Sequence, residues 1–408
     1  MNKNHWLLSL SFVFISFSLI AQDSSITQSP PQKIIPKEGL DFIDVARSIF
    51  HKHPSPRTDT TDNKTGKFHT SVLPSVQYTL QTGFAVAVNA NTAFYTSNHE
   101  DANISSVALS VNYTQKHQFF IPIQGNFWTP GNKINILTDW HYEKYPQQTF
   151  GLGGYTTSAD GYNIDYNYVR LYQAFMKTIS PDFFIGAGYD LDYYWNVLEV
   201  DPPAGVVTDF QKYGLTNRSV SSGITLNVLY DRRRNSLNPK PGYYANIVLR
   251  NNFTFLGSDV NWQSLLIDAR KYIHFPAKSP NTLAFWTYDW FTVSGKPPYL
   301  NLANTACDTY LNMGRGYIQA RFRGQNLVYF ESEYRFKILN NGLIGGVAFL
   351  NAQSYTEQES KRFEVVSPGY GVGLRFKFNK FSNTNIALDY GWGSHGSQGI
   401  FVNLGEVF

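Results

Sequence analysis

From Thr70 to Phe408, apolar and polar residues alternate with a period of two. In residues 183–195, aromatic and aliphatic side chains alternate with a set that includes Gly186, Gly188 and Asp190. The same alternation recurs in the segments 107–113, 220–230 and 370–378. Such segments are typical of β-strands with one apolar and one polar face. They run for about 10–14 residues, near the ~9–11 that cross a bilayer at a tilt and longer than the ~5–6 of soluble strands.

Sixteen such segments follow one another, and the lengths of their connections sort by parity. Compact turns follow even-numbered segments, as at Trp128–Lys133, Ser180–Asp182 and Leu339–Gly342. The long connections all follow odd-numbered segments and are Tyr145–Tyr162, Leu198–Asn217, Ser294–Gln325 and Asn351–Pro368. This sorting is expected when short turns face one side of a membrane and long loops face the other. The sequence therefore predicts an all-β fold, a transmembrane antiparallel β-barrel of sixteen strands over residues 70–408.

The N-terminal residues differ in composition from the barrel region. Residues 1–21 combine Lys3, an apolar run and Ala21, which predicts a cleaved signal peptide and export. A membrane anchor helix is the alternative, but the run is shorter than the ~20 residues such a helix needs. Residues 22–69 are rich in Ser, Pro, Lys, Thr and Asp, and we expect a mostly unstructured periplasmic tether.

One short amphipathic helix is predicted within the tether, over residues 38–53. Phe42, Val45 and Ile49 recur at helical spacing, and Asp41 is suited to cap the first turn. Three roles stay open for this helix: packing at the barrel mouth, lying on the membrane surface, or binding nothing.

The composition agrees with a membrane barrel and excludes other classes. Aromatic and charged residues each make up 16% of the 408 residues, whereas charge in soluble domains averages about 25%. Tyr and Trp gather near strand ends, as interfacial girdles require, at Trp128, Tyr142, Trp195, Tyr272 and Trp392. A net charge of +4 without a basic stripe argues against nucleic acid binding. The single cysteine, Cys307, excludes a disulfide within the chain.

The longest late connection carries the motif Gly314, Arg315, Gly316 and Tyr317. In the strand that follows, Glu331 and Glu333 fall on the interior face together with Arg335, while Val328, Phe330 and Tyr334 face lipid. Carboxylates inside a barrel wall need a cationic partner, because buried charge is tolerated mainly when it is paired. Glycine lets a loop turn tightly and reach inward. We therefore expect Arg315 to pair with this strand.

Arg315-Gly316-Tyr317, followed by a strand ending Glu333-Tyr334-Arg335-Phe336, resembles the bacterial surface antigen family. This family is the barrel domain of the BamA/TamA outer-membrane assembly superfamily. The resemblance covers about residues 70–408. It implies sixteen strands and a sixth outer loop that folds inside the barrel with an Arg-Gly-aromatic tip. It also implies a C-terminal insertion signal, here Phe408.

The chain departs from the family pattern in three places. Only about fifty residues separate the signal peptide from the first strand, so we expect a form lacking POTRA domains. Asn351 stands where the family has an Asp that pairs with the loop arginine, so Asn351 is a weaker pairing candidate and Glu333 becomes the expected counter-charge. Glu406 stands where the terminal signal usually has a second aromatic residue.

The resemblance implies an outer-membrane protein that assists insertion or translocation of proteins or other envelope components. The implied partners are outer-membrane lipid, client outer-membrane proteins and a separate periplasmic partner. The family's first and last strands pair weakly, which would let a client edge enter the wall between Ser71–Leu80 and Gln398–Phe408. The alternative is a passive pore or a ligand-binding receptor without an assembly role.

No catalytic, metal or cofactor motif stands out. Gly151-Leu152-Gly153-Gly154 has neither the Lys-Ser/Thr nor the helix of a phosphate loop. The histidines are dispersed, which speaks against a metal site. Asp190 and Asp192 share an interior face and are read as a polar lumen rather than as an acid–base pair. We therefore expect no enzyme activity and no cofactor.

Overall fold

The computed structural model describes residues 41, 68–98, 102–214, 216–233, 235, 238–380 and 383–408. The predicted signal peptide (1–21) and nearly all of the tether (22–69) lie outside the described residues, and so does the predicted helix over 38–53 except for Asp41.

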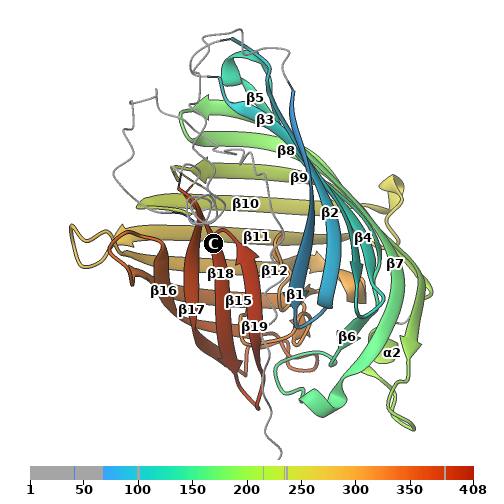
Figure 1. Cartoon of the computed structure of the whole chain (residues 1–408). Helices are drawn as coiled ribbons and strands as arrows, with labels where there is room; N and C mark the ends of the chain where they lie inside the picture. Colours follow the sequence, from blue (N-terminus) through green and yellow to red (C-terminus); the bar gives the residue numbers. More distant parts are fainter. Residues whose placement is uncertain are drawn as a thin grey trace, which may run out of the picture.

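The described chain forms one antiparallel sheet of seventeen strands that curls into a barrel (Figure 1). Sixteen of these strands are long. The first eight are β1 (His69–Thr79), β2 (Gly83–Tyr95), β3 (Ile104–Thr114), β4 (Phe119–Trp128), β5 (Ile134–Lys144), β7 (Tyr162–Ser180), β8 (Phe183–Val200) and β9 (Arg218–Asp231). The other eight are β10 (Gly242–Asn252), β11 (Trp262–His274), β12 (Thr282–Gly295), β15 (Asn326–Lys337), β16 (Ile344–Tyr355), β17 (Ser367–Asn379), β18 (Thr384–Gly393) and β19 (Gln398–Leu404). The predicted sixteen-stranded antiparallel barrel is thus confirmed.

The remaining elements are short. They are β6 (Gln147–Thr149), which pairs with the first residues of β7, the pair β13 (Ala303–Asn304) and β14 (Arg323–Gly324), the helix α2 (Asp209–Gly214), and the 3-10 turns η1 (Pro130–Asn132), η2 (Ser158–Asp160), η3 (Thr254–Leu256) and η4 (Tyr299–Asn301). Within the described ranges no helix combines the length and apolar character needed to cross a membrane.

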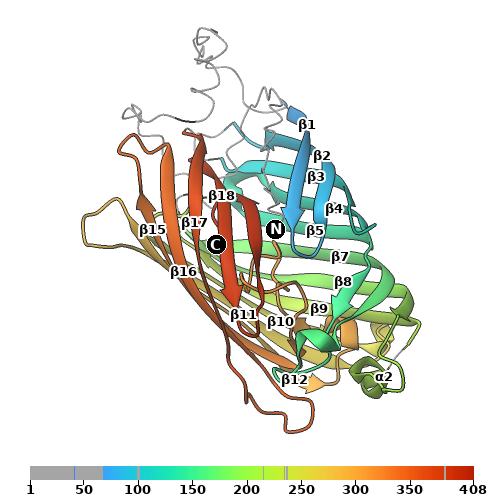
Figure 2. The same ribbon diagram turned by 60° about the horizontal axis from the view of Figure 1, so that its bottom comes forward.

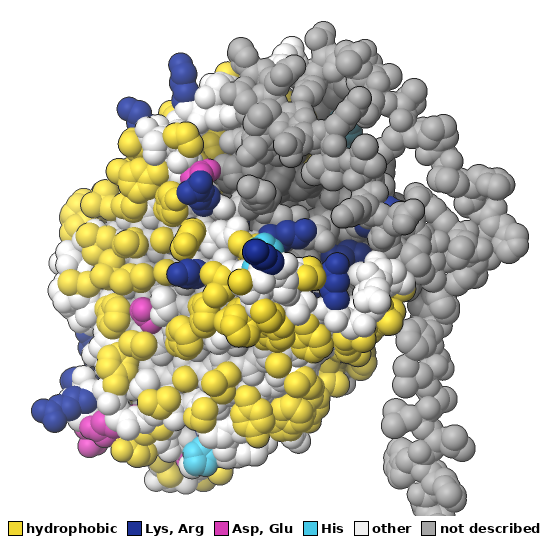
Figure 3. All heavy atoms as spheres, turned by 90° about the vertical axis from the view of Figure 1, so that its left-hand side faces the viewer, with side chains coloured by type: hydrophobic (Ala, Val, Ile, Leu, Met, Phe, Trp, Pro, Cys, Tyr) yellow, Lys and Arg dark blue, Asp and Glu magenta, His cyan; other side chains and the backbone are white. Residues whose placement is uncertain are grey.

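Side chains alternate between the two faces of the barrel wall, because successive residues of a strand point to opposite sides. On β2, Phe84, Val86 and Val88 are exposed on the outside, whereas Ala85 and Ala87 are buried on the inside. The side of the barrel seen in Figure 3 is covered mainly by hydrophobic side chains, with few charged groups between them. The apolar face predicted from the alternation is therefore the outer face.

The two ends of the barrel differ in the length of their connections. The longest connections, residues 145–161, 201–217, 296–325 and 356–366, all follow odd-numbered strands of the sixteen, and we call their side the long-loop end. The opposite short-turn end has compact turns such as 129–133 and 181–182. The connection predicted as Asn351–Pro368 is shorter, because β16 continues to Tyr355 and β17 begins at Ser367.

The barrel is not sealed by hydrogen bonds where its first and last strands meet. β1 lies beside β19 (Figures 1 and 2), but no backbone ladder joins them within the described residues. By contrast, β1 pairs with β2 over its whole length, from His69 opposite Ala93 to Thr79 opposite Gly83. We call the β1–β19 junction the seam. At the seam, a Cβ added to Gly399 would lie 2.3 Å from Leu80 Cδ2, so the two residues touch.

The last strand ends earlier than predicted. The sequence analysis extended it to Phe408, but β19 stops at Leu404. Gly405 then adopts a φ of 98°, a left-handed conformation that favours glycine. The three residues that follow are buried, so the chain turns from the wall into the barrel. We call Gly405–Phe408 the C-terminal tail.

Candidate functional site

The longest loop, residues 296–325, folds into the barrel from the long-loop end. Met313, Arg315, Tyr317 and Phe322 are all buried although they belong to a loop. The pair β13–β14 forms the base of the loop, and Thr305 Oγ1 donates to Gln353 Oε1 on the wall (3.1 Å). This inward loop fills part of the barrel interior with its own side chains.

The tip of the inward loop lies directly against the wall backbone. Gly314 and Gly316 have φ values of 82° and 106°, which only glycine adopts without strain. A Cβ on Gly316 would lie 2.7 Å from the Trp392 carbonyl oxygen, and one on Gly391 would lie 2.7 Å from Gly316 N. The two glycines of the motif therefore permit both the turn and the close approach to β18.

Arg315 extends from this tip into a ring of carboxylates. Its guanidinium donates to Asp389 Oδ2 (2.5 Å) and forms ion pairs with Glu331 and Glu333. The guanidinium carbon also stacks 3.7 Å from the centroid of the Phe349 ring. The side chains of Arg315 and its three carboxylate partners are 0% exposed, so water does not screen the attraction.

Further ion pairs extend this arrangement along the wall. Arg335 Nε pairs with Glu333 Oε1 (2.6 Å), and Arg375 Nη1 pairs with Asp389 Oδ1 (2.5 Å). Arg375 Nε also pairs with Glu406 Oε2 of the C-terminal tail (2.6 Å). We call the seven residues the wall cluster: Arg315, Glu331, Glu333, Arg335, Arg375, Asp389 and Glu406.

Because its members come from the loop, β15, β17, β18 and the tail, the wall cluster ties together segments that are distant in the sequence. Removing one member of such a buried set leaves an uncompensated charge, which is strongly destabilising.

Asn351 contacts the loop differently from the family aspartate. Its Nδ2 donates to the carbonyl oxygen of Arg315 (2.9 Å), so it holds the main chain and not the guanidinium. Glu333 is not the sole counter-charge either, because Glu331 and Asp389 share that role. Sequence reasoning missed Asp389. The alternation of β18 does place Asp389 on the interior face, but spacing alone cannot select it from other interior residues.

Tyr317 anchors the far side of the loop tip. Its hydroxyl donates to the Pro368 carbonyl (2.5 Å) and accepts from the Ser394 backbone N–H (2.8 Å). Ser397 Oγ donates to the carbonyl of Gly316 (2.7 Å). The Arg-Gly-Tyr tip is thus fixed to the long-loop ends of β17 and β18 as well as to the wall cluster.

The C-terminal tail packs against the same interior. Phe408 stacks on Trp286 with ring centroids 5.2 Å apart and lies 6.2 Å from Tyr272. Arg335 Nη2 donates to the Phe408 carbonyl (2.8 Å). Phe408, proposed from the resemblance as an insertion signal on the last strand, therefore lies inside the barrel and off the strand.

Two aromatic residues predicted for the outer girdles also lie inside. Tyr272 packs against Phe408, and Trp128 packs against Phe184, so the girdle prediction was wrong for both. Their side chains fall on the interior face because of their register in the strands, which the number of aromatic residues near strand ends does not reveal.

Outer loops cover the barrel over the inward loop. Gly153 N donates to the Arg323 carbonyl (2.8 Å), and Gly154 N donates to Glu357 Oε1 (2.8 Å). Burial raises the pKa of the Glu357 carboxyl, although the Gly154 N–H partly offsets this effect. We call these interlocked connections, 145–161, 201–217, 296–325 and 356–366, the outer cover.

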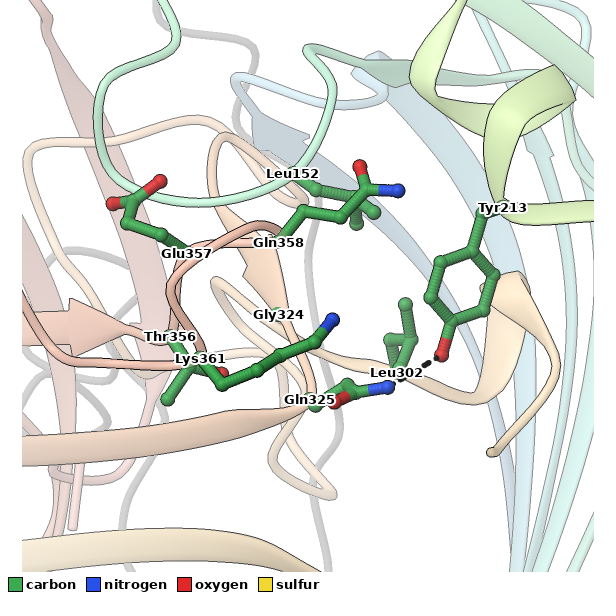
Figure 4. Close-up of a pocket in the computed structure, with 9 residues that line it drawn as sticks. All are labelled: Leu152, Tyr213, Leu302, Gly324, Gln325, Thr356, Glu357, Gln358 and Lys361. Atoms are coloured by element: carbon green, nitrogen blue, oxygen red, sulfur yellow. Dashed lines mark hydrogen bonds between the residues drawn. The ribbon is translucent and has the colours of Figure 1, made fainter. Parts of the chain in front are cut away.

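Figure 4 shows a cavity in the outer cover. It is bordered by the hydrogen bond between Gln325 Nε2 and the Tyr213 hydroxyl (3.3 Å), and by Glu357 and Lys361. The space between these side chains, part of which is open to solvent, is about 200 Å³.

A second polar cluster lies on the opposite interior wall. Arg250 Nη1 pairs with Asp192 Oδ2 (2.6 Å), and Tyr172 donates to the same carboxylate (2.9 Å). Asp192 thus belongs to an ion pair of the polar interior, and its neighbour Asp190 accepts from Arg250 through its backbone carbonyl (3.4 Å). In the part of the chain that the structure describes, no group of three or more His, Cys, Asp or Glu side chains is arranged to hold a metal ion.

Comparisons with known proteins show the fold. No protein-family model matches the sequence, and no curated protein sequence matches it. Among solved structures, the chain is similar to BamA from Haemophilus ducreyi lacking POTRA domains 1-3, with 13% identity and a TM-score of 0.55 over 89% of this chain and 76% of that one. It is also similar to CdiB from Acinetobacter baumannii, with 13% identity and a TM-score of 0.53 over 83% of this chain and 60% of that one. The chain therefore has the barrel fold of BamA and CdiB.

Proposed function

We propose that this protein is an outer-membrane barrel that assists the insertion or translocation of proteins or other envelope components by opening its wall at the seam. The observation that carries this proposal is that, in the described part of the chain, no ladder joins β1 to β19, whereas the other fifteen junctions are all hydrogen-bonded. The likeness to BamA and CdiB supports it at the level of fold.

The surface of the barrel supports placement in a membrane. An apolar outer face suits contact with lipid, and the alternation of exposed Val86 and Val88 with buried Ala87 is the pattern of a lipid-facing strand. The long-loop end then faces the exterior and the short-turn end faces the periplasm. A chain exported through the signal peptide at residues 1–21 reaches this membrane from the periplasmic side.

The mechanism follows from the unequal junctions. A strand without a ladder on one side presents backbone N–H and C=O groups to which another strand can be added. Opening the seam breaks few backbone hydrogen bonds, whereas opening any other junction breaks a full ladder. The wall cluster and the inward loop hold β15 to β18 together while the edge at β1 and β19 exchanges partners.

The partners that suit this mechanism are outer-membrane lipid, client outer-membrane proteins and a separate periplasmic protein that delivers them. The role needs no cofactor, no metal, no nucleic acid and no catalysed reaction.

The test is to lock the seam. Leu80 and Gly399 touch across it, so Leu80→Cys with Gly399→Cys places two thiols for a disulfide. Cells depleted of the native protein and supplied with the locked variant should show lower levels of other outer-membrane barrels, and a reductant should restore them. The control is Ser75→Cys with Ala87→Cys, which joins β1 to β2 at a pair already in register. Normal levels with the seam locked would contradict the proposal.

A passive pore makes a different prediction. The inward loop and the C-terminal tail fill one side of the interior, so single-channel recordings should show only small or transient conductance. A large, steady conductance that Arg315→Ala leaves unchanged would favour a pore.

A further inference from the structure

The connection after β10 makes a short excursion from the barrel wall. β10 ends at Asn252, and the 3-10 turn η3 follows almost at once, with Gly257 after it in a left-handed conformation (φ 95°). The chain is bonded to the wall again at Asp259, whose N–H donates to the Val220 carbonyl of β9 (2.9 Å). In Figure 1 this excursion is the yellow segment that projects from the wall after β10. We call residues 253–258 the outer turn.

Ser222 shows on which face of the wall the outer turn lies. Ser222 is on the same face of β9 as Ile224, which is 42% exposed on the outside, because residues two positions apart on a strand point to the same side. Ser222 itself is 0% exposed, and its hydroxyl donates to the Leu256 carbonyl of the outer turn (2.8 Å). The hydroxyl of Tyr189, which also faces outward, lies 2.8 Å from Ser222 Oγ. The outer turn therefore covers part of the outer face of the barrel.

The outer turn lies close to a group of outward-facing aromatic residues near the long-loop end. Tyr193 stacks on Trp195 with ring centroids 5.0 Å apart, and Tyr142 lies 6.3 Å from Trp195. In the ladder between β8 and β9, Tyr193 is paired with Val220, two residues along β9 from Ser222. Aromatic rings on the outside of a barrel gather at the boundary between lipid headgroups and acyl chains. In the membrane placement proposed above, the outer turn lies at this boundary.

The side chains of the outer turn are suited to lipid. Phe255 is 78% exposed, the highest value among the large hydrophobic side chains that the structure describes, and its ring stacks on that of Phe253 (5.0 Å). The outer turn itself contains no charged residue. The exposed ion pair of Arg218 with Asp259 (3.6 Å) lies beside the aromatic group, because Arg218 is paired with Trp195 in the ladder. Two phenylalanine rings displayed in this way gain free energy when they leave water.

The backbone of the outer turn is also suited to an apolar environment. In residues 253–259, every backbone N–H except that of Phe255 donates a hydrogen bond within the protein. The Thr254 N–H donates to Asn261 Oδ1 (2.7 Å), for example, and the Gly257 N–H donates to the Thr254 carbonyl (3.0 Å). Such pairing is needed in contact with lipid, where no water replaces a missing partner.

We propose that the outer turn is a lipid anchor, in which Phe253 and Phe255 insert among the acyl chains of the outer leaflet. This role rests on the proposed function, because it requires that the barrel span a membrane. The outer turn follows β10, the ninth of the sixteen long strands, so it lies half-way round the barrel from the seam. An anchor at this place holds the far wall at a fixed level in the membrane while the seam opens.

Fluorescence quenching of the full-length protein in lipid vesicles tests this proposal. In a Cys307→Ala background, Phe255→Cys carries an environment-sensitive fluorophore. Leu226→Cys, on the outer face of β9, is the lipid control, and Val206→Cys, in an outer loop, is the water control; both side chains are more than half exposed. Acyl chains with a nitroxide near the headgroup should quench the Phe255 probe roughly twofold more than the Val206 probe, and aqueous iodide should quench it roughly twofold less.

The three probes separate the possible outcomes. If iodide quenches the Phe255 probe as strongly as the Val206 probe, while the nitroxide quenches the Leu226 probe, the lipid anchor is overturned and the membrane placement stands. If iodide quenches all three probes, the membrane placement fails and the anchor fails with it. A Phe255 probe that is shielded from both quenchers would show that protein, such as a second copy of this chain, covers the outer turn, and would overturn the proposal as well.

Discussion

The two sides of the barrel interior are built from different chemistry. On β15, β17 and β18, charged residues face inward and are desolvated, as Glu331, Glu333 and Asp389 show. On β1 to β4 the inward-facing residues include no Asp, Glu, Lys or Arg, and Ser75, Asn89 and Ser110 remain partly accessible. There, a chain of hydrogen bonds runs from Ser110 Oγ to Asn89 Oδ1 (2.8 Å) and from Asn89 Nδ2 to Ser75 Oγ (2.8 Å).

This difference indicates which strands of the barrel wall resist separation and which separate more easily. Desolvated ion pairs that join several strands resist separation, because each group left unpaired is costly. Neutral groups in contact with water lose little when their partners move. The part of the wall that is held by ion pairs ends at β18, next to the short β19. The part with uncharged inward-facing residues begins at β1. The seam is therefore the junction between these two parts. We expect the following substitutions to have effects that fall in this order.

The largest effect should come from Arg315→Ala. It leaves Glu331, Glu333 and Asp389 with an uncompensated negative charge, and a loss of about 3–5 kcal/mol in unfolding free energy is expected. The measurement is the temperature at which the folded, fast-migrating band disappears on gels. Arg218→Ala is the matched control, because the ion pair of Arg218 with Asp259 is exposed and should contribute about 0–1 kcal/mol. Equal shifts for the two variants would refute the bracing role of the wall cluster.

Glu333→Ala should rank second, with a loss of about 3 kcal/mol. Its arginine partners keep other contacts, since Arg315 retains Glu331 and Arg375 retains Glu406, which places the effect at the lower end of the range. The same gel assay measures it. Unchanged heat resistance would show that Glu333 does not pair with Arg315 in the folded barrel.

Glu406→Gln should have a smaller effect, about 1.5 kcal/mol, at the low end for hydrogen bonds to charged groups. The amide keeps one acceptor for Arg375 Nε or for Asn385 Nδ2, both 2.6 Å from the carboxylate, but loses the charge. Protease sensitivity of the C-terminus should rise with the loss of stability. A tail that stays protected would mean that the packing of Phe408 alone retains it.

Asn89→Ala should have the smallest effect, about 0.5–1 kcal/mol, because water can replace it as a partner of Ser75 and Ser110. Thermal unfolding in detergent is the measurement. A loss as large as that of Arg315→Ala would remove the contrast between the two sides.

The fold could be predicted from the sequence, but only part of the site could. The period of two and the parity of loop lengths depend on local spacing, and both survive into the structure in the strands from β1 to β19. The motif at Arg315 and the strand with Glu331 and Glu333 could also be recognised, because they too depend on local spacing. Asp389 and Arg375 were not singled out, because their meeting with Arg315 depends on how the loop is seated, which spacing does not encode.

The C-terminal tail shows a different limit of sequence reasoning. The alternation through Ile400, Val402 and Leu404 breaks at Glu406, but nothing local showed that Gly405 would adopt a positive φ. Glu406 departs from the family pattern, which has an aromatic residue at this position. Its ion pair with Arg375 explains why a carboxylate stands there. The identity of residue 406 thus depends on its partner inside the barrel and not on the alternation of the last strand.

Hydrogen exchange of backbone amides in the intact, lipid-embedded protein tests the central claim most directly, because it reports how readily each strand opens. If the seam is the weak line of the wall, the amides of β1 and β19 should exchange roughly tenfold or more faster than those of β15 and β16, which are ladder-bonded on both sides. Equal protection of all four strands would contradict the account.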